Sequence, residues 1–87
     1  MHAVVVRVTV HNPEGAEQRL REEVVPQVSS APGFRAGYWT REGSNGLSMV
    51  IFDSEDNARA GAERVPAGLP EGVTLEGVEV REVVASA

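Results

Sequence analysis

The sequence contains no cysteine, no lysine and few aromatic residues, which make up 5% of its 87 residues. The absence of cysteine excludes disulfides, thiolate nucleophiles and cysteine-based zinc sites, and the absence of lysine excludes side-chain amine chemistry. No apolar run approaches the ~20 residues that cross a bilayer. Because the start of the chain lacks the basic leader and cleavage pattern of a secretory signal, we expect a cytoplasmic protein without membrane partners.

The chain is acidic, with a net charge of −5 at pH 7. Binding of a phosphate backbone needs clustered basic residues, so the composition argues against a nucleic-acid partner. A domain of this length buries only about 60–65% of its unfolded surface. We therefore expect one domain, residues 1–87, that gains stability by associating with copies of itself.

Four segments have the pattern of β-strands. The first has valine at every second position, which is typical of a strand with one apolar face. The third is almost entirely apolar, as in a central strand that is covered on both faces. In the last, the alternation slips near Gly77 or Glu82, which predicts a β-bulge or an exchanged strand. The four segments are residues 2–11, 34–42, 47–52 and 73–85.

The second of these strands alternates between two faces from its first residue to its last. One parity holds Phe34 and Tyr38, which we expect in the core with the tyrosine hydroxyl at its rim. The other parity holds Trp39 and Arg41, which we expect on the opposite face. Residues 43–46 are rich in glycine and predict a hairpin loop to the next strand.

Two segments have the signals of helices. Asn12 followed by Pro13 is a helix start, because asparagine can accept a backbone N–H and proline is tolerated at the first helical position. Apolar residues then recur every four positions until Pro26, which should end or kink the helix. A second helix is predicted to begin after Ser54 and to stop before Pro66.

The order of the elements is therefore β-α-β-β-α-β, which predicts an α+β fold of the ferredoxin-like kind. In such a fold, a four-stranded antiparallel sheet carries both helices on one face. The other face would expose Val5, Trp39 and, depending on register, Met49 and Ile51, and these residues are too apolar for contact with water. We expect a second copy of the chain to cover this face.

Four stretches together resemble a known family: APGF at residues 31–34, GYWTR at 37–41, VIFDSE at 50–55 and VEVREV at 78–83. They are similar to stretches of the small dimeric α/β-barrel proteins related to antibiotic-biosynthesis monooxygenases. The resemblance covers most of the chain and implies a homodimer in which two sheets pack face to face. It also implies a range of activities, from cofactor-free oxygenation of polycyclic phenols to haem degradation.

Haem degradation is disfavoured within this range. The haem-degrading members need an asparagine on the first strand, a tryptophan in the second helix and a histidine after that helix. The corresponding places hold Val6 and Gly61, and residues 66–72 contain no histidine. We therefore expect neither haem nor another cofactor.

The cofactor-free oxygenases of the family use asparagine, tryptophan, tyrosine and arginine around an apolar pocket between helices and sheet. The resemblance therefore suggests Tyr38, Trp39 and Arg41 as catalytic residues, without a match position by position. A single tryptophan on a sheet face is more often an interface anchor, and Tyr38 is more often part of a core.

Arg7 and His11 are the candidate ligand-binding residues. Arginine can hold an anionic substrate, and a histidine can act as a general base. In an acidic protein, however, Arg7 and Arg41 are favoured to pair with Glu79 or Glu82 across strands. The spacing of the histidines and carboxylates does not suggest a metal site.

Two functions remain open. The first is an enzyme or binding protein that holds a small aromatic compound in an apolar pocket and oxidises it without metal or flavin. The second is a non-catalytic dimeric module, structural or ligand-binding, in which the same side chains serve as core, interface and surface pairs.

Overall fold

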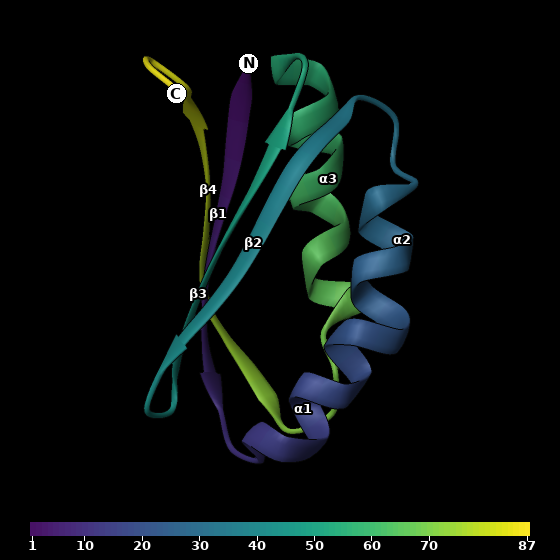
Figure 1. Cartoon of the computed structure of the whole chain (residues 1–87), viewed down its shortest axis with the longest axis vertical. Helices are drawn as coiled ribbons and strands as arrows, with labels where there is room; N and C mark the ends of the chain where they lie inside the picture. Colours follow the sequence, from purple (N-terminus) through teal and green to yellow (C-terminus); the bar gives the residue numbers. More distant parts are fainter.

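The computed structural model describes all 87 residues and has the ferredoxin-like βαββαβ topology that the sequence predicts (Figure 1). Its four strands form one antiparallel sheet in the order β2-β3-β1-β4. The elements are β1 (His2–Val10), α1 (Pro13–Arg19), the π-helical turn η1 (Leu20–Val24), α2 (Val25–Ser29), β2 (Phe34–Glu42), β3 (Asn45–Phe52), α3 (Glu55–Gly68) and β4 (Val73–Glu82).

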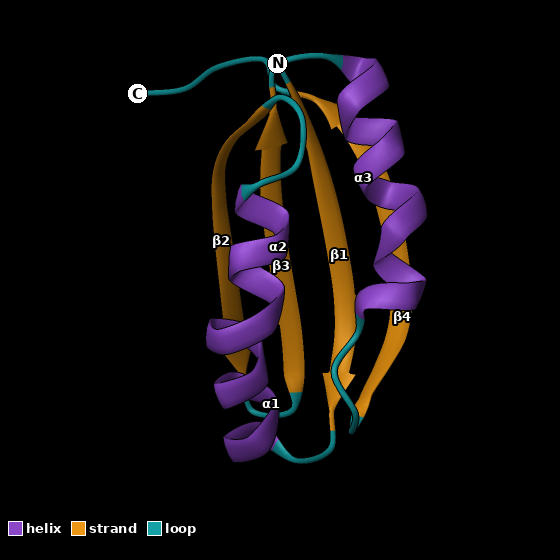
Figure 2. Ribbon diagram, turned by 90° about the vertical axis from the view of Figure 1, so that its right-hand side faces the viewer, coloured by secondary structure: helices purple, strands orange, loops and turns teal.

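The helices form a single layer on one face of the sheet (Figure 2). The continuous helix α1–η1–α2, which we call the first helix, lies over β2 and β3, whereas α3 lies over β1 and β4. Both termini lie at the same end of the molecule, and the C-terminal residues extend away from it (Figures 1 and 2). None of the helices combines the length and the apolar character that crossing a membrane requires.

Both helices begin at the predicted N-caps. The Asn12 Oδ1 accepts a hydrogen bond from the Gly15 N–H at 3.4 Å, and the Ser54 Oγ accepts one from the Asn57 N–H at 3.2 Å. Each bond satisfies one of the backbone donors that a helix start leaves without a partner.

Neither proline ends its helix. The first helix continues through Pro26 to Ser29, and the turn before the proline is widened to η1, in which the Val25 N–H bonds to the Leu20 carbonyl. This wider turn relieves the clash between a proline ring and the preceding turn. The expectation that the second helix stops before Pro66 is wrong, since α3 runs on to Gly68.

A β-bulge near the start of β2 changes which residues share a face. Phe34 lies opposite Phe52, and the next pair along the strand is Ala36 with Ile51, so Arg35 is an extra residue. Because side chains alternate with a period of two, one extra residue reverses the faces that follow. Odd- and even-numbered residues therefore exchange faces at the bulge, so that the alternation that starts at Phe34 does not continue beyond Ala36.

The predicted faces of three residues on β2, Tyr38, Trp39 and Arg41, are wrong for this reason. Tyr38 lies opposite Met49, on the face without helices, and its exposed fraction is 66%. Trp39 lies opposite Ser48 and packs against the core under the helices. Tyr38 is thus not a core partner of Phe34, and Trp39 does not belong to the uncovered face.

The slip predicted near Gly77 is a β-bulge in β4. Arg7 lies opposite Gly77, but the next residue, Val8, lies opposite Leu75, so Glu76 is the extra residue. The strand then ends at Glu82, three residues before the predicted end. Whether this strand is exchanged between subunits stays a prediction.

The core lies between the centre of the sheet and α3. Val4, Val6, Val50, Phe52 and Ala58 form its buried cluster, and Ala58 has no exposed surface. Its position explains the small residues of α3, which allow the helix backbone to approach the sheet closely.

Candidate functional site

A cavity of about 820 Å³ lies between the sheet and the helices. Its volume is within the range of about 300–1,000 Å³ that is typical of small-molecule sites, and 17 of its 29 lining residues are hydrophobic. The sheet contributes β1 valines such as Val6 and Val8, and the first helix contributes Leu20, Val24 and Val28. The site is therefore an apolar chamber.

The cavity exists because the first helix stands away from the sheet. Leu20 and Val24 point toward the sheet but are only half-buried, and neither packs against the core cluster. Of the apolar stripe along this helix, only Ala16 is buried, while Val28 reaches the core near the end of the helix. The helix thus packs more closely near Ala16 and Val28 and leaves space around Leu20 and Val24 between them.

The π-helical turn keeps this apolar stripe in line. The stripe repeats every four residues, which is longer than the α-helical period of 3.6 and would rotate steadily away from the sheet. Residues Leu20–Val24 have the wider i to i+5 bonding, so the stripe continues to face the cavity. Turns of this kind occur frequently at functional sites.

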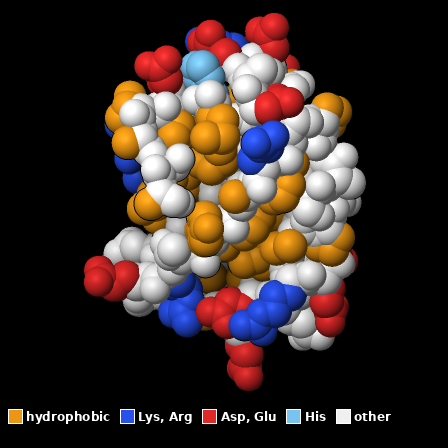
Figure 3. Space-filling view, turned by 45° about the horizontal axis from the view of Figure 1, so that its top comes forward, with side chains coloured by type: hydrophobic (Ala, Val, Ile, Leu, Met, Phe, Trp, Pro, Cys, Tyr) orange, Lys and Arg blue, Asp and Glu red, His pale blue; other side chains and the backbone are white.

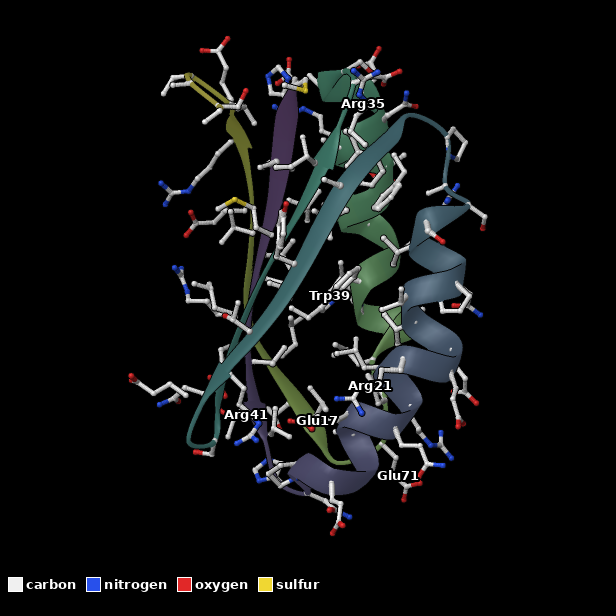
Figure 4. The ribbon with its side chains drawn as sticks, in the orientation of Figure 1. Glu17, Arg21, Arg35, Trp39, Arg41 and Glu71 are labelled. Carbon is white, nitrogen blue, oxygen red and sulfur yellow. The ribbon has the colours of Figure 1, made fainter.

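Trp39 is the one tryptophan of the chain, and it lies on the wall of the cavity. Figure 4 shows its ring pointing from β2 into the space under the helices. A Cβ atom at Gly37 would lie 2.8 Å from the Trp39 Cη2, so the glycine gives the indole the room to lie along its own strand. An indole held in this way offers a flat surface for a planar ligand.

Charged residues gather at one end of the cavity. The Arg41 Nε donates to the Glu17 Oε1 at 3.0 Å, and the Arg41 Nη1 donates to the Gly43 carbonyl at 2.7 Å. The Arg21 Nη2 lies 4.0 Å from the other oxygen of Glu17. Figure 4 shows Arg41, Glu17 and Arg21 at the lower end of the space between sheet and helices, and Figure 3 shows a band of hydrophobic side chains that ends at basic and acidic groups.

A third arginine, Arg64 of α3, also lines the cavity, and no carboxylate lies within ion-pair distance of it. Glu17 is the only acidic residue of the lining. With three arginines against one glutamate, the lining has a net charge of +2, although the chain as a whole has −5. The cavity is therefore electropositive within an acidic protein.

Arg7 belongs to a different cluster, on the face without helices. Its Nη2 donates to the Glu79 Oε1 at 2.6 Å, and Arg81 donates to the other oxygen of Glu79. The hydrogen bond from Arg81, and then that from Arg7, holds the pKa of Glu79 below its ordinary value. The predicted pairing of Arg7 with Glu79 is confirmed.

Arg41 does not share that partner. The expectation that it pairs with Glu79 or Glu82 is wrong, because Arg41 points to the helix side of the sheet and binds Glu17. His11 lies outside the cavity, where its Nε2 is 2.8 Å from the Thr74 Oγ1. The structure thus brings Trp39 and Arg41 together and separates both from the remaining candidates.

The face without helices is apolar over β2 and β3. Tyr38, Leu47 and Met49 have exposed fractions of 66%, 45% and 43%, and Ile51 continues the row, opposite Ala3. As predicted, Met49 and Ile51 belong to this face. Val5 also lies there, but its neighbours on the sheet leave it only 8% exposed.

Sequence reasoning missed Glu17, Arg21 and Arg64 as residues of the cavity. The two residues of the first helix each follow a member of its apolar stripe, Ala16 and Leu20, by one position. A charged residue at that place lies on the border of the buried face, which is the signal that could have identified them.

The comparisons with known proteins add no identification. No family model matches the chain, and no curated protein matches it significantly. The chain has no group of three or more histidine, aspartate or glutamate side chains arranged to hold a metal ion.

Proposed function

We propose that this protein is a homodimeric α/β-barrel protein, similar to the antibiotic-biosynthesis monooxygenases, that binds a small aromatic compound in its cavity. The observation that carries the proposal is the apolar chamber of about 820 Å³ with Trp39 on its wall and Arg41 at one end. A chamber of this kind matches the arrangement expected of a small-molecule site, in which a few polar groups orient a ligand held by apolar walls.

Binding can be measured through Trp39 itself. Because it is the one tryptophan and lines the cavity, 2-naphthol bound beside it should quench its fluorescence. A Val24→Phe variant adds bulk to the cavity wall, so we expect calorimetry to show naphthol binding at least about tenfold weaker while the protein stays folded. Unchanged binding in the Val24→Phe variant, or the absence of binding to the parent, would contradict the proposal.

The resemblance extends the proposal to oxidation without a cofactor. With anthrone, whose enol is a polycyclic phenol, the ring methylene loses two hydrogens and gains one oxygen from O₂, and the other oxygen leaves as water. The substrate supplies all four electrons. The guanidinium of Arg41 would stabilise the electron-rich phenolate form, so an oxygen electrode should record uptake that falls in Arg41→Gln and in Val24→Phe. Oxygen uptake equal to the uncatalysed rate would contradict the proposed oxidation, and only the proposed binding of an aromatic compound would remain.

In the proposed dimer, the second copy of the chain packs against the face of the sheet that carries no helices. Support comes from its exposed apolar row, Tyr38, Leu47 and Met49, next to the charged cluster of Arg7 and Glu79. Monomeric proteins rarely leave a large apolar patch in water, and a two-fold interface needs one patch that complements itself. Sedimentation equilibrium should give a dimer for the parent and a monomer for Met49→Asp, whereas a concentration-independent monomer for the parent would rule the dimer out.

A further inference from the structure

The charges at the end of the cavity separate it from an ordinary apolar pocket. An aromatic ligand without charge would need only the valines and Trp39, yet three arginines line the chamber. The chain has eight basic residues in total, so more than a third of them line one cavity of an acidic protein. A ligand with a negative charge would explain why the arginines are concentrated in this cavity.

The positive charges of two of the three arginines are not neutralised by a close carboxylate. Glu17 accepts hydrogen bonds from Arg41, and its distance to Arg21 is at the limit of an ion pair. The side chain of Arg21 is 78% exposed. Arg64 has no carboxylate partner at all, so the lining holds three guanidinium groups and a single carboxylate.

The three arginines of the cavity lining come from separate elements. Arg41 comes from the end of β2, Arg21 from η1 and Arg64 from the C-terminal half of α3. The C-terminal end of α3 lies beside the first helix, because residues of both, Gly68 and Gln27 among them, line the cavity and a smaller hollow next to it. The hydrogen bonds of Arg41 to Glu17 and Gly43 also fix its guanidinium before any ligand arrives.

We infer that the ligand is an aromatic anion, with its rings beside Trp39 and a carboxylate at the end of the cavity where Arg21 and Arg41 lie. The inference rests on the proposed function, since it names the class of compound that the same cavity takes. Arginine suits this task because its planar group donates paired hydrogen bonds to a carboxylate. The apolar walls beside it strengthen the attraction, because they exclude water from one side.

A pair of probes that differ only in charge tests this inference. 2-Naphthoate carries a carboxylate, and methyl 2-naphthoate has the same rings without the charge. We expect the parent protein to bind naphthoate about tenfold more tightly than the ester, as measured by Trp39 fluorescence and by calorimetry. Added salt should weaken the binding of naphthoate and leave that of the ester unchanged.

Variants of the charged residues assign the effect to this end of the cavity. Arg21→Gln and Arg41→Gln should each weaken naphthoate binding about three- to tenfold and leave the ester unaffected. Arg35→Gln is the matched control, because Arg35 is exposed, forms no ion pair and does not line the cavity. Glu17→Gln removes the only acidic group of the lining and should tighten naphthoate binding.

The outcomes separate this inference from the proposed function. If the ester binds as tightly as naphthoate, the site takes neutral aromatic compounds, and the inference is overturned while the proposed function stands. If neither probe binds, the proposed function fails and the inference fails with it. A loss of naphthoate binding in Arg35→Gln equal to that in Arg41→Gln would show a general charge effect and would also overturn the inference.

Discussion

The two helices on the sheet are packed in opposite ways. α3 lies close to the strands: Ala58 is fully buried, and a Cβ atom at Gly61 would lie only 2.8 Å from the Phe52 Cζ. The first helix presents larger side chains, yet Leu20 and Val24 remain half-buried and do not reach the core cluster. The helix with the smaller residues therefore supplies the core, and the helix with the larger ones encloses the cavity.

The difference shows how a small chain can combine stability with a binding site. Close approach by α3 gives a dense core around Phe52, where each methylene group contributes to stability. The first helix contributes less to that core and instead forms a wall whose position the π-helical turn maintains. The two helices thus differ in their share of the core, although α3 also contributes Arg64 to the cavity lining, and substitutions can test this difference.

The largest effect on the free energy of unfolding is expected in the closely packed core under α3. Phe52 is 3% exposed and belongs to the core cluster, so Phe52→Ala should lower the free energy of unfolding by about 3–5 kcal/mol. This is a large part of the stability of a small domain. Urea denaturation followed by circular dichroism measures the loss, and a loss below about 1 kcal/mol would show that the core lies elsewhere.

The next effect tests how closely α3 approaches the sheet. Gly61→Ala places a methyl group against the Phe52 ring, and overpacking of a core costs about 1–3 kcal/mol. The higher helix propensity of alanine offsets ~1 kcal/mol, so we expect a net loss of about 1 kcal/mol in urea denaturation.

Gly68→Ala on the same helix is the matched control, because nothing lies within 4 Å of a Cβ atom there. It should leave the protein equally or more stable. A Gly61→Ala protein that is as stable as Gly68→Ala would mean that α3 is not closely packed.

The sequence could predict the elements of this architecture, because the relevant signals are local. The side chains of Asn12 and Ser54 cap the helices that follow them, and the valine alternation of β1 defines its apolar face. The uncovered face of the sheet followed from the order of the elements alone. These predictions needed no knowledge of distant contacts.

The site could be predicted only in part, because it depends on the register between strands. One extra residue, Arg35, places Phe34 and Tyr38 on opposite faces and moves Trp39 under the helices. The sequence contains no local signal for this bulge. The sequence also could not predict the distance between the first helix and the sheet, since that distance depends on how the facing side chains pack. The same packing sets the angle of α3, and therefore whether Arg64 lines the cavity.

A smaller effect on the free energy of unfolding is expected under the first helix, beside the cavity. Leu20 lines the cavity and does not pack against the core cluster, so Leu20→Ala removes atoms that already border empty space. We expect a loss below about 1 kcal/mol in urea denaturation, less than the 2–5 kcal/mol of a buried leucine. The same variant should change the affinity for 2-naphthol, because Leu20 lines the cavity. A loss above 2 kcal/mol would show that the first helix is packed as closely as α3.

The smallest effect concerns ion pairs on the helix surfaces. In α3, the Arg59 Nη2 lies 2.7 Å from the Glu55 Oε2, and this hydrogen bond, together with the charge of Arg59, holds the pKa of Glu55 below its ordinary value. In the first helix, the pair of Arg19 and Glu23 has the reverse order along the chain and spans 3.9 Å, and this order is the weaker one for residues four apart.

A lowered pKa means that the folded protein favours the charged form of Glu55, so the pair stabilises the protein above the ordinary pKa of a glutamate, roughly pH 4.3. That contribution disappears as the pH falls through the lowered value. At pH 7, Glu55→Gln should therefore shift the urea midpoint downward by a small amount and Glu23→Gln by less, and the difference between Glu55→Gln and the parent should shrink as the pH is lowered below the ordinary pKa of a glutamate. Equal shifts for the two variants at pH 7 would show that the two ion pairs contribute equally to stability despite their different distances, and that the two helices differ only in how they face the sheet.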